Sequence, residues 1–429
     1  MSPTFASLSI RNYRIYALGA IVSNVGTWMG RVAQDWVVLT ELTDHSASAL
    51  GIVTGLQFLP MLVLAPWTGA VVDRYPKRVL LYITQAALGL AALAGGLLVV
   101  TGTAALWHFY LLALVTGIAT AFDNPTRQTF VSEMVPRERL SNAVALNSAS
   151  FNLGRLIGPA VAGLVIAGIG SGQALLVNSL SFVTVIVALL ALRASELTPA
   201  PRLTGRGSAL EGLRYVRGRP DIVLVMVLIF VLGTFGMNFQ ITIALMATQV
   251  FGRGAEDYGL LGSIMAVGSL SAALLAARRS EPRLRVLLLS LVGFTFAAGF
   301  AALAPTYATF AVALAACGLT ALTTMTTANA MVQMRTDPVM RGRVMALYMA
   351  IFLGGTPLGA PMIGWTGDVF GARWTILVGS LAVGFAAAAA ILYVMLTDRL
   401  TVTLERHPWH LEVVSAGQAA KAITPEQVR

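Results

Sequence analysis

Hydrophobic positions along this chain gather in long continuous runs, and most charged residues lie in the segments between the runs. A helix needs about 20 apolar residues to cross the hydrocarbon core of a bilayer, and each run reaches about that length. The pattern therefore predicts an all-α polytopic membrane protein. Its twelve transmembrane helices are expected near 14–40, 47–72, 79–101, 106–125, 142–168, 173–193, 221–250, 258–277, 286–304, 307–330, 343–366 and 374–396.

The pattern of the first half nearly returns in the second half. Gly26-Thr27-Trp28 is matched by Gly233-Thr234-Phe235, and the segment 78–81 is matched by 285–288, both at an offset of 207 residues. Parallel repeats of this kind pack around a central cavity in membrane transporters. We expect two pseudo-symmetric six-helix bundles. The predicted boundaries are 1–194 for the N-terminal bundle, 195–220 for a cytoplasmic linker, 221–396 for the C-terminal bundle and 397–429 for a cytoplasmic tail.

The predicted linker carries signals of its own. Pro199 and Pro201 stop a helix at its start. The apolar residues between 210 and 216 can line one side of a short helix, which we expect at the membrane surface.

Composition and charge placement both favour a membrane protein. The 429 residues are 57% hydrophobic and 11% charged, whereas charged residues approach a quarter of an average soluble domain. Of 29 Lys and Arg, 25 lie in the termini and alternate loops, two in the opposite loops (Arg253 and Arg373) and two inside helices (Arg31 and Arg155). By the positive-inside rule both termini are cytoplasmic in a multi-pass protein of the cell membrane. The basic residues behind the net charge of +10 thus determine the orientation of the chain in the membrane, and we expect no nucleic-acid partner.

Several function classes lack their sequence signals. The two lysines, Lys77 and Lys421, do not end a P-loop pattern, so a primary pump is excluded. The four histidines fall in loops or the tail without a paired metal motif, and no nucleophile elbow occurs. We expect no enzyme, metal or cofactor; a membrane-embedded enzyme or a non-transporting sensor remains a remote alternative. Energy for transport is expected from an ion or solute gradient.

The loop after the second predicted helix combines a glycine, an acid and clustered bases. Gly69 permits close helix approach, Asp73 can cap the next helix or pair with a base, and Arg74 and Arg78 stay cytoplasmic. This segment resembles the loop signature of the major facilitator superfamily, although Pro76 stands where that family usually has Gly. The resemblance covers the whole membrane region and implies a monomer in which this loop acts as a cytoplasmic gate latch.

The fifth predicted helix carries small residues on one face. Gly154, Gly158 and Gly163 allow backbone-to-backbone packing, and Pro159 bends the helix. The segment resembles the family's exporter-associated motif and is repeated between 354 and 364. The alternative is a tight helix contact without meaning for the direction of transport.

Three further segments, 28–36, 135–142 and 337–343, narrow the resemblance to the branch with enterobactin-type siderophore exporters and macrolide-efflux proteins. This implies a secondary exporter that works by alternating access. The resemblance further implies that a small amphipathic molecule such as a siderophore, macrolide or other drug leaves in exchange for a proton. A lysophospholipid or other lipid transporter, or an importer of the same fold, is the alternative.

Polar residues share one face of the first helix. Asn24, Arg31 and Asp35 follow at spacings of seven and four, and charges inside a bilayer are costly enough to suggest function. Asp35 and Arg31 are candidates for proton coupling, and Asn24 for substrate binding. The alternative is a permanent structural Arg31–Asp35 pair.

The repeat sets Asn238 opposite Arg31 and Thr242 opposite Asp35, so the charges belong to the N-terminal half alone. Asn238, Gln240 and Thr242 become candidates for substrate binding from the other half. The alternative is that these polar side chains form hydrogen bonds to a neighbouring helix.

Two more helices contribute candidates. Asp123 and Arg127 lie at the cytoplasmic end of the predicted fourth helix, near the expected depth of the gate loop. This placement favours a network of alternating charges that acts as a gate. Proton carriage by Asp123 and a simple helix-end ion pair are the alternatives. Arg155, deep in the fifth helix, can meet an anionic substrate group or Asp35, or be satisfied by backbone carbonyls near Pro159.

Overall fold

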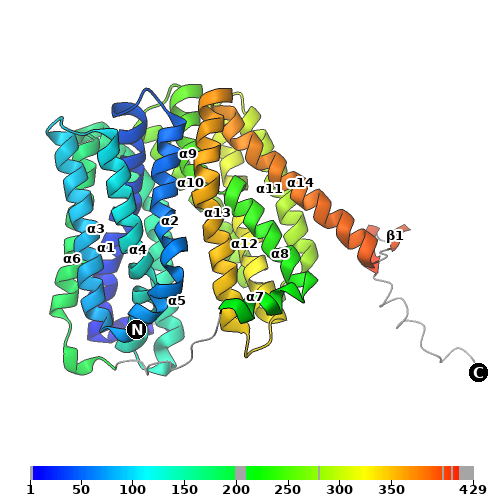
Figure 1. Ribbon diagram of the computed structural model, residues 1–429, viewed down its shortest axis with the longest axis horizontal. Coiled ribbons are helices and arrows are strands. Elements are labelled where there is room, and N and C mark those ends of the chain that lie inside the picture. Colours follow the sequence, from blue (N-terminus) through cyan, green and yellow to red (C-terminus); the bar gives the residue numbers. More distant parts are fainter. Residues whose placement is uncertain (1–2, 199–208, 279–280, 399–400, 407–408, 415–429) are drawn as a thin grey trace, which may run out of the picture.

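The computed structural model describes residues 3–198, 209–278, 281–398, 401–406 and 409–414. Two bundles of roughly parallel helices stand side by side, the N-terminal half on the left of Figure 1 and the C-terminal half on the right. The N-terminal half contains a short 3-10 segment (Pro3–Ser9), a π-helical turn (Val37–Glu41), α1 (Arg11–Trp36), α2 (Ala47–Arg74), α3 (Lys77–Val100), α4 (Leu106–Met134), α5 (Arg137–Ile169) and α6 (Ser171–Ala191).

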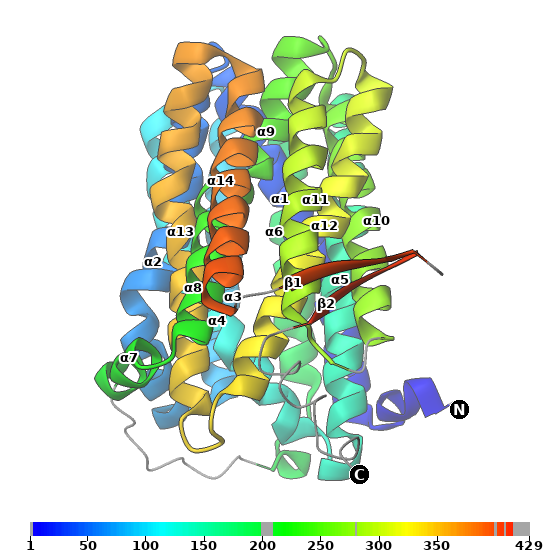
Figure 2. The ribbon, with the colours of Figure 1, turned by 90° about the vertical axis from the view of Figure 1, so that its right-hand side faces the viewer.

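The C-terminal half repeats this arrangement with one helix broken. It contains α8 (Pro220–Val231), α9 (Phe239–Leu245), α10 (Ala255–Ala277), α11 (Leu284–Leu303), α12 (Tyr307–Arg335), α13 (Arg341–Phe370) and α14 (Ala372–Asp398), with π-helical turns at Leu232–Gly236 and Met246–Val250. Figure 2 shows α11 and α14 on the outer side of this half.

Eleven helical spans within the described residues are long and apolar enough to cross a membrane, with Pro220–Val250 counted as one. The twelfth is α1, whose 26 residues extend about 39 Å and pack along α5 and α6. Its polar residues, including Arg14, Arg31 and Asp35, make it less apolar than the others. The predicted fold, twelve transmembrane helices in two six-helix bundles, is confirmed.

The connecting segments hold short elements. The predicted linker, 195–220, contains the end of a 3-10 turn (Ala194–Glu196) and α7 (Ala209–Arg217), the short helix expected there, while 199–208 lie outside the described residues. Of the predicted tail, Thr401–Arg406 (β1) and Trp409–Val414 (β2) pair as an antiparallel hairpin, which the sequence pattern did not indicate. Residues 415–429 lie outside the described part.

The run 221–250, expected as a single helix, is interrupted at Met237 and Asn238. The Asn238 side-chain nitrogen donates to the carbonyl oxygen of Thr234 at 2.7 Å, the acceptor that a continuing helix would offer to the Asn238 backbone N–H. A side chain thus replaces a backbone hydrogen bond where the helix breaks.

Two seams join the halves, α5 against α10 and α2 against α13. A Cβ added at Gly259 would lie 2.1 Å from the carbonyl oxygen of Pro159, and one added at Gly51 would lie 2.5 Å from that of Ala360. These two contacts occupy matching positions of the repeat. Glycine is therefore required at both seams because backbone meets backbone.

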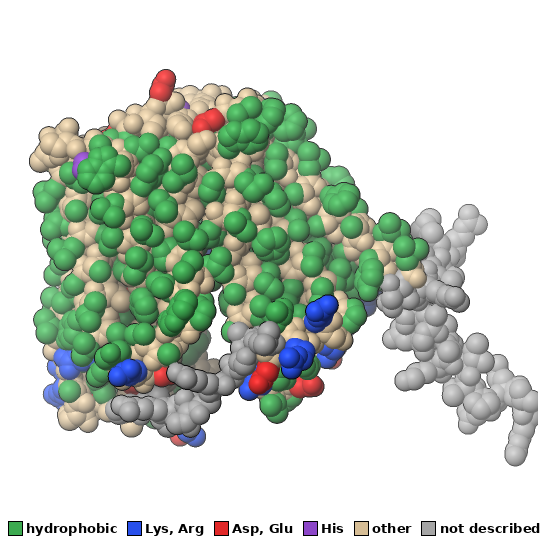
Figure 3. Space-filling view, in the orientation of Figure 1, with side chains coloured by type: hydrophobic (Ala, Val, Ile, Leu, Met, Phe, Trp, Pro, Cys, Tyr) green, Lys and Arg blue, Asp and Glu red, His purple; other side chains and the backbone are tan. Residues whose placement is uncertain are grey.

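The α2–α13 seam covers only part of the helix length. The α2–α13 seam runs from Ala47, beside Gly364, to Leu62, beside Gly354. Beyond it the side chain of Trp67 on α2 is exposed. The space-filling view is hollowed between the halves at its lower edge (Figure 3), the end that carries the N-terminus and α7. The molecule is closed at the end of the α1–α2 connection and separated at the opposite end.

Candidate functional site

Asp35 lies in the last turn of α1, where the two halves meet. Its side chain is 3% exposed, and Oδ2 accepts a hydrogen bond at 3.2 Å from the hydroxyl of Tyr258 on α10. The Trp36 indole stacks on the Tyr258 ring at a centroid distance of 6.4 Å and an interplanar angle of 21°. A buried carboxyl group of the N-terminal half is thus bound by a side chain of the C-terminal half.

No Lys, Arg or His nitrogen in the described part of the chain lies within 4.0 Å of the Asp35 carboxyl group. The Arg31 guanidinium lies instead over the rings of Trp28, at 4.9 Å, and Phe58, at 5.9 Å. The permanent Arg31–Asp35 pair considered from the sequence is therefore not formed in this conformation. Tyr258 takes the place of the cation.

Trp28 is flanked by two cations. Besides Arg31, the Arg155 guanidinium lies 5.8 Å from the Trp28 ring centroid. Both arginines are half-buried, and neither forms an ion pair with a described carboxylate. Two unpaired guanidinium groups over one aromatic ring favour an anionic ligand that carries apolar surface.

The glycines of α5 explain why Arg155 reaches Trp28. A Cβ at Gly158 would lie 2.5 Å from the Trp28 Cβ, and one at Gly154 would lie 2.8 Å from the backbone carbon of Asn24. Any larger side chain would push α5 away from α1. The Asn24 side-chain nitrogen donates to Ser150 Oγ at 2.9 Å, so this substrate-binding candidate bonds across to the neighbouring helix.

The remaining two residues of the α5 motif serve the seam between the halves. Gly163 packs against Ala255 and Glu256 of α10, and the carbonyl oxygen of Pro159 meets Gly259. One face of the α5 motif therefore positions the Arg155 guanidinium near Trp28, and the other face packs against α10 in the seam between the halves.

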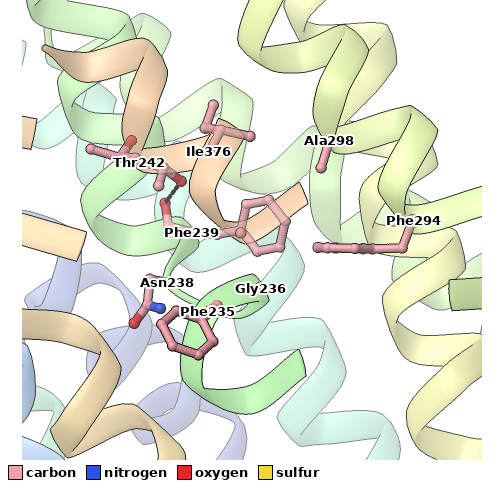
Figure 4. Close-up of a pocket in the computed structure, with 10 residues that line it drawn as sticks. Phe235, Gly236, Asn238, Phe239, Thr242, Phe294, Ala298 and Ile376 are labelled. Carbon is pink, nitrogen blue, oxygen red and sulfur yellow. Dashed lines mark hydrogen bonds between the residues drawn. The ribbon is translucent and has the colours of Figure 1, made fainter. Parts of the chain in front are cut away.

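Two of the candidates around the helix break, Asn238 and Thr242, line a small cavity (Figure 4). Asn238 and Thr242 are 3% and 4% exposed, and they line a cavity of about 10 Å³ with Phe235 and Phe239. That volume is about what one water molecule needs. The Thr242 hydroxyl donates to the Phe239 carbonyl oxygen at 3.4 Å, whereas Asn238 Oδ1 has no partner among the described residues.

No space for an organic substrate therefore reaches Asn238 or Thr242 through this cavity. Gln240, between them in sequence, is half-buried and does not line the cavity.

Asp123 is held within the N-terminal half. Its Oδ1 accepts hydrogen bonds from Thr84 Oγ1 and Gln85 Nε2, both at 2.7 Å, and its Oδ2 accepts one from Arg127 Nε at 2.6 Å. Three donors around a carboxylate that is 5% exposed favour the ion-pair alternative over proton carriage.

The predicted gate residues lie apart from this pair. Asp73 and Arg74 are exposed at the end of α2, and a Cβ at Gly69 would meet no atom within 4 Å. The close helix approach expected at Gly69 is thus absent from this conformation, in which the ends of the two halves are separated.

Arg78 donates to the Tyr82 hydroxyl at 3.2 Å and to the Leu190 carbonyl oxygen at 3.4 Å, not to Asp123. An ion pair that the sequence did not single out lies beside it, because Lys77 Nζ is 3.2 Å from Glu133 Oε1. Both of these side chains are almost fully buried.

A second polar link crosses between the halves at the closed end. The Asp368 carboxylate of α13 accepts hydrogen bonds from Ser46 Oγ at 3.2 Å and from the backbone N–H groups of Ala47 at 2.6 Å and Ser48 at 3.0 Å. It therefore caps the N-terminus of α2, where a carboxylate is favoured by the free N–H groups and the helix dipole.

Sequence reasoning missed Tyr258 and Asp368. A tyrosine at a helix start forms no pattern, whereas Asp35 was found because it interrupts an apolar run. Asp368 lies just beyond the run 343–366, so a search for acids at the ends of runs would have found it.

Comparisons with known proteins agree with this architecture. Residues 2–418 match the model of the family described as transmembrane secretion effector. The staphyloferrin A transporter of Staphylococcus aureus is 27% identical over 356 residues, which cover 81% of this chain and 87% of the relative. The enterobactin exporter EntS of Escherichia coli O157:H7 is 26% identical over 353 residues, covering 81% and 83%.

Solved structures show the same fold. A bacterial homolog of the human lysosomal transporter Spinster, inward-facing and unoccupied, aligns with a TM-score of 0.71 at 15% identity and covers 91% of this chain and 97% of its own. The D-xylose-proton symporter aligns with a TM-score of 0.69 at 13% identity, covering 88% and 96%. The chain belongs to the transmembrane secretion effector family of the major facilitator superfamily and is a multi-pass membrane transporter, not an enzyme.

Proposed function

We propose that this transporter is a secondary exporter that works as a monomer with both termini in the cytoplasm. It moves a small amphipathic organic molecule of siderophore type outward while a proton moves inward. The observation that carries the proposal is the buried Asp35 carboxyl group, which has no cation partner in the described part of the chain and accepts a hydrogen bond across the seam from Tyr258.

Alternating access follows from what must change at the closed end. Opening that end separates α5 from α10 and so removes the Tyr258 hydroxyl from Asp35. A charged carboxylate that loses its donor in a low-dielectric surrounding is costly, and a bound proton removes that cost. Proton binding to Asp35 is therefore favoured when the seam opens, and proton release when it closes. This links the protonation of Asp35 to the direction in which the central space faces.

The substrate class is argued from the pair of cations on Trp28. Arg31 and Arg155 have no carboxylate partner among the described residues, so an anionic group of the substrate would supply one, while the Trp28 ring would contact an apolar or aromatic part. The names of two relatives, a staphyloferrin A transporter and an enterobactin exporter, support a siderophore.

We assign a role to the gate loop, which carries Gly69, Asp73, Arg74 and Arg78, in the conformation where the now separated ends of the two halves have closed. Gly69 faces open space here, and Asp73 and Arg74 are exposed. When the separated ends approach, Gly69 would allow close packing, and the charges of Asp73, Arg74 and Arg78 would come into reach of the opposite half. The resemblance of this loop to the superfamily signature supports a latch.

The experiment is proton movement in inside-out vesicles that carry the protein. A pH gradient is imposed, and siderophores, macrolides, dyes and lysophospholipids are added in turn. We expect a siderophore to collapse the gradient with the native protein and not with Asp35→Asn. Asp44→Asn, which changes an exposed acid in the α1–α2 connection, is the matched control and should behave as the native protein.

Gradient collapse of equal size with Asp35→Asn would contradict the coupling role of Asp35. A response to lysophospholipids alone would replace the siderophore with a lipid substrate. If a siderophore were exchanged without a pH gradient and without proton movement, the protein would be a siderophore transporter and the proposed proton coupling would be wrong.

A further inference from the structure

A groove of about 690 Å³ lies between α7, α8 and α13. Its volume falls within the range of roughly 300–1,000 Å³ that is usual for sites of small organic ligands. Eight of its ten lining residues are apolar, and the other two are Arg214 and Arg217 of α7. The groove is thus an apolar space with two cations from one short helix.

The apolar wall of the groove is a stripe along a membrane helix. Val223, Val227 and Phe230 follow one another on α8 at spacings of four and three, and all three are exposed. Leu347 and Ile351 of α13, one turn apart, form the opposite wall. Exposed apolar side chains in line on a transmembrane helix are suited to a hydrocarbon chain.

The two cations lie where α7 crosses the end of this stripe. The three helices are on the near side of the molecule in Figure 1, and in Figure 3 basic side chains gather over α7 and the lower end of α8, below an apolar surface. The charges therefore lie at one end of the apolar wall and not along it.

The acids around α7 are already engaged by other residues. Glu211 pairs with Arg343 at 2.7 Å, and Asp221 pairs with Arg219 at 3.0 Å. Asp337 accepts a hydrogen bond from the Tyr215 hydroxyl at 3.1 Å.

The Glu211–Arg343 pair holds α7 against α13, and the Tyr215–Asp337 hydrogen bond holds it against the connection between α12 and α13. Arg214 and Arg217 are left without a hydrogen bond or ion pair to any described residue.

We infer that this groove binds one anionic phospholipid of the bilayer, with an acyl chain along Val223, Val227 and Phe230 and the phosphate at Arg214 and Arg217. The charge complementarity carries the choice of an anionic lipid, because a zwitterionic headgroup would bring a second cation to two unpaired arginines. The site is separate from the Asp35 region and does not depend on the proposed substrate. Because α13 also forms the seam with α2, a lipid here contacts a helix that must move during transport.

The experiment is native mass spectrometry of the full-length protein with phosphatidylglycerol or phosphatidylcholine of identical acyl chains. We expect one phosphatidylglycerol retained in preference to phosphatidylcholine. Arg214→Gln with Arg217→Gln should weaken its retention by roughly tenfold or more, since each basic residue near the headgroups adds to the attraction. The matched control is Arg283→Gln with Arg285→Gln, which removes two exposed and unpaired arginines at the start of α11.

A second variant tests the apolar part. Val227→Trp fills the groove and leaves both arginines in place, so phosphatidylglycerol retention should fall while the melting temperature stays near that of the native protein. Equal retention of the two lipids by the native protein would overturn the inference. So would equal losses in the two double-arginine variants, unchanged retention in Val227→Trp, or displacement of the lipid by inorganic phosphate. Retention of a siderophore in the groove, lost in Val227→Trp, would assign the groove to substrate and also overturn it.

Discussion

The two seams have the same backbone geometry and different polar chemistry. At α5–α10, Gly259 meets the carbonyl oxygen of Pro159, and at α2–α13, Gly51 meets that of Ala360. The α5–α10 seam has the buried Asp35–Tyr258 hydrogen bond beside it, whereas the α2–α13 seam ends at the exposed Asp368 carboxylate on the N-terminus of α2. The repeat thus preserves the helix packing of the seams, whereas the buried carboxyl group on which the proposed proton coupling rests belongs to one half.

The largest effect is expected where the seams are equivalent. Gly259→Val and Gly51→Val each place a side chain within 2.5 Å of a carbonyl oxygen, so neither seam can close without displacement of a helix. Overpacking of this kind costs about 1–3 kcal/mol or more. We expect both variants to lose nearly all transport in vesicle assays. They should favour the conformation that is open at the end of the α1–α2 connection.

Gly168→Val, at an exposed position of α5, is the control for these variants because a Cβ there meets no atom within 4 Å. It should leave the melting temperature unchanged. If only one of the two valine variants lost transport, the equivalence of the seams would be refuted.

The next effect separates the seams by their chemistry. Asp35→Asn removes the titrating group, so transport driven by a pH gradient should fall by two orders of magnitude or more, while exchange of labelled for unlabelled substrate continues. Asp368→Asn changes an exposed carboxylate outside the proposed proton path and should retain driven transport. Equal loss of driven transport in both variants would make the two carboxylates equivalent and remove the contrast drawn here.

A smaller effect is expected from Asp368→Ala. The variant leaves the N–H groups of Ala47 and Ser48 without their carboxylate, and loss of a helix cap costs about 0.5–2 kcal/mol. The closed end should open several-fold more often, seen as faster labelling of a cysteine introduced at Ser48. A matched Asp44→Ala change should leave the labelling rate as it is, and no change with Asp368→Ala would show that the cap does not hold the seam.

The smallest effect is expected from Tyr258→Phe, which keeps the ring stacked on Trp36 and removes one hydrogen bond. The net contribution of a hydrogen bond between neutral groups is about 0.5–1.5 kcal/mol, and this value applies once Asp35 has taken up a proton. We expect driven transport to persist at a reduced rate, with its pH optimum shifted relative to the native protein. A pH profile identical to that of the native protein would remove Tyr258 from the coupling mechanism.

The sequence predicted the helices and their duplication because both depend on local properties, the length of apolar runs and the spacing of glycines. Asp35 and Arg155 were found in the same way, as charges inside those runs. The break at Asn238 was not predicted, since it arises when one side chain takes the backbone acceptor of Thr234. The partner of Asp35 was not predicted either, because Tyr258 lies 223 residues away and only the packing of the halves brings it close.

In the proposed mechanism, protonation of Asp35 is linked to opening of the closed end. This link is tested most directly by distances between spin labels at Thr103→Cys and Pro305→Cys, exposed positions in the α3–α4 and α11–α12 connections, with buried Cys317 replaced by Ala. Pulsed electron paramagnetic resonance would be recorded at several pH values for the native background and for Asp35→Asn. Acidification should shift the native background toward longer distances, and Asp35→Asn should show the longer distances at every pH. The same pH response in both proteins would contradict this link.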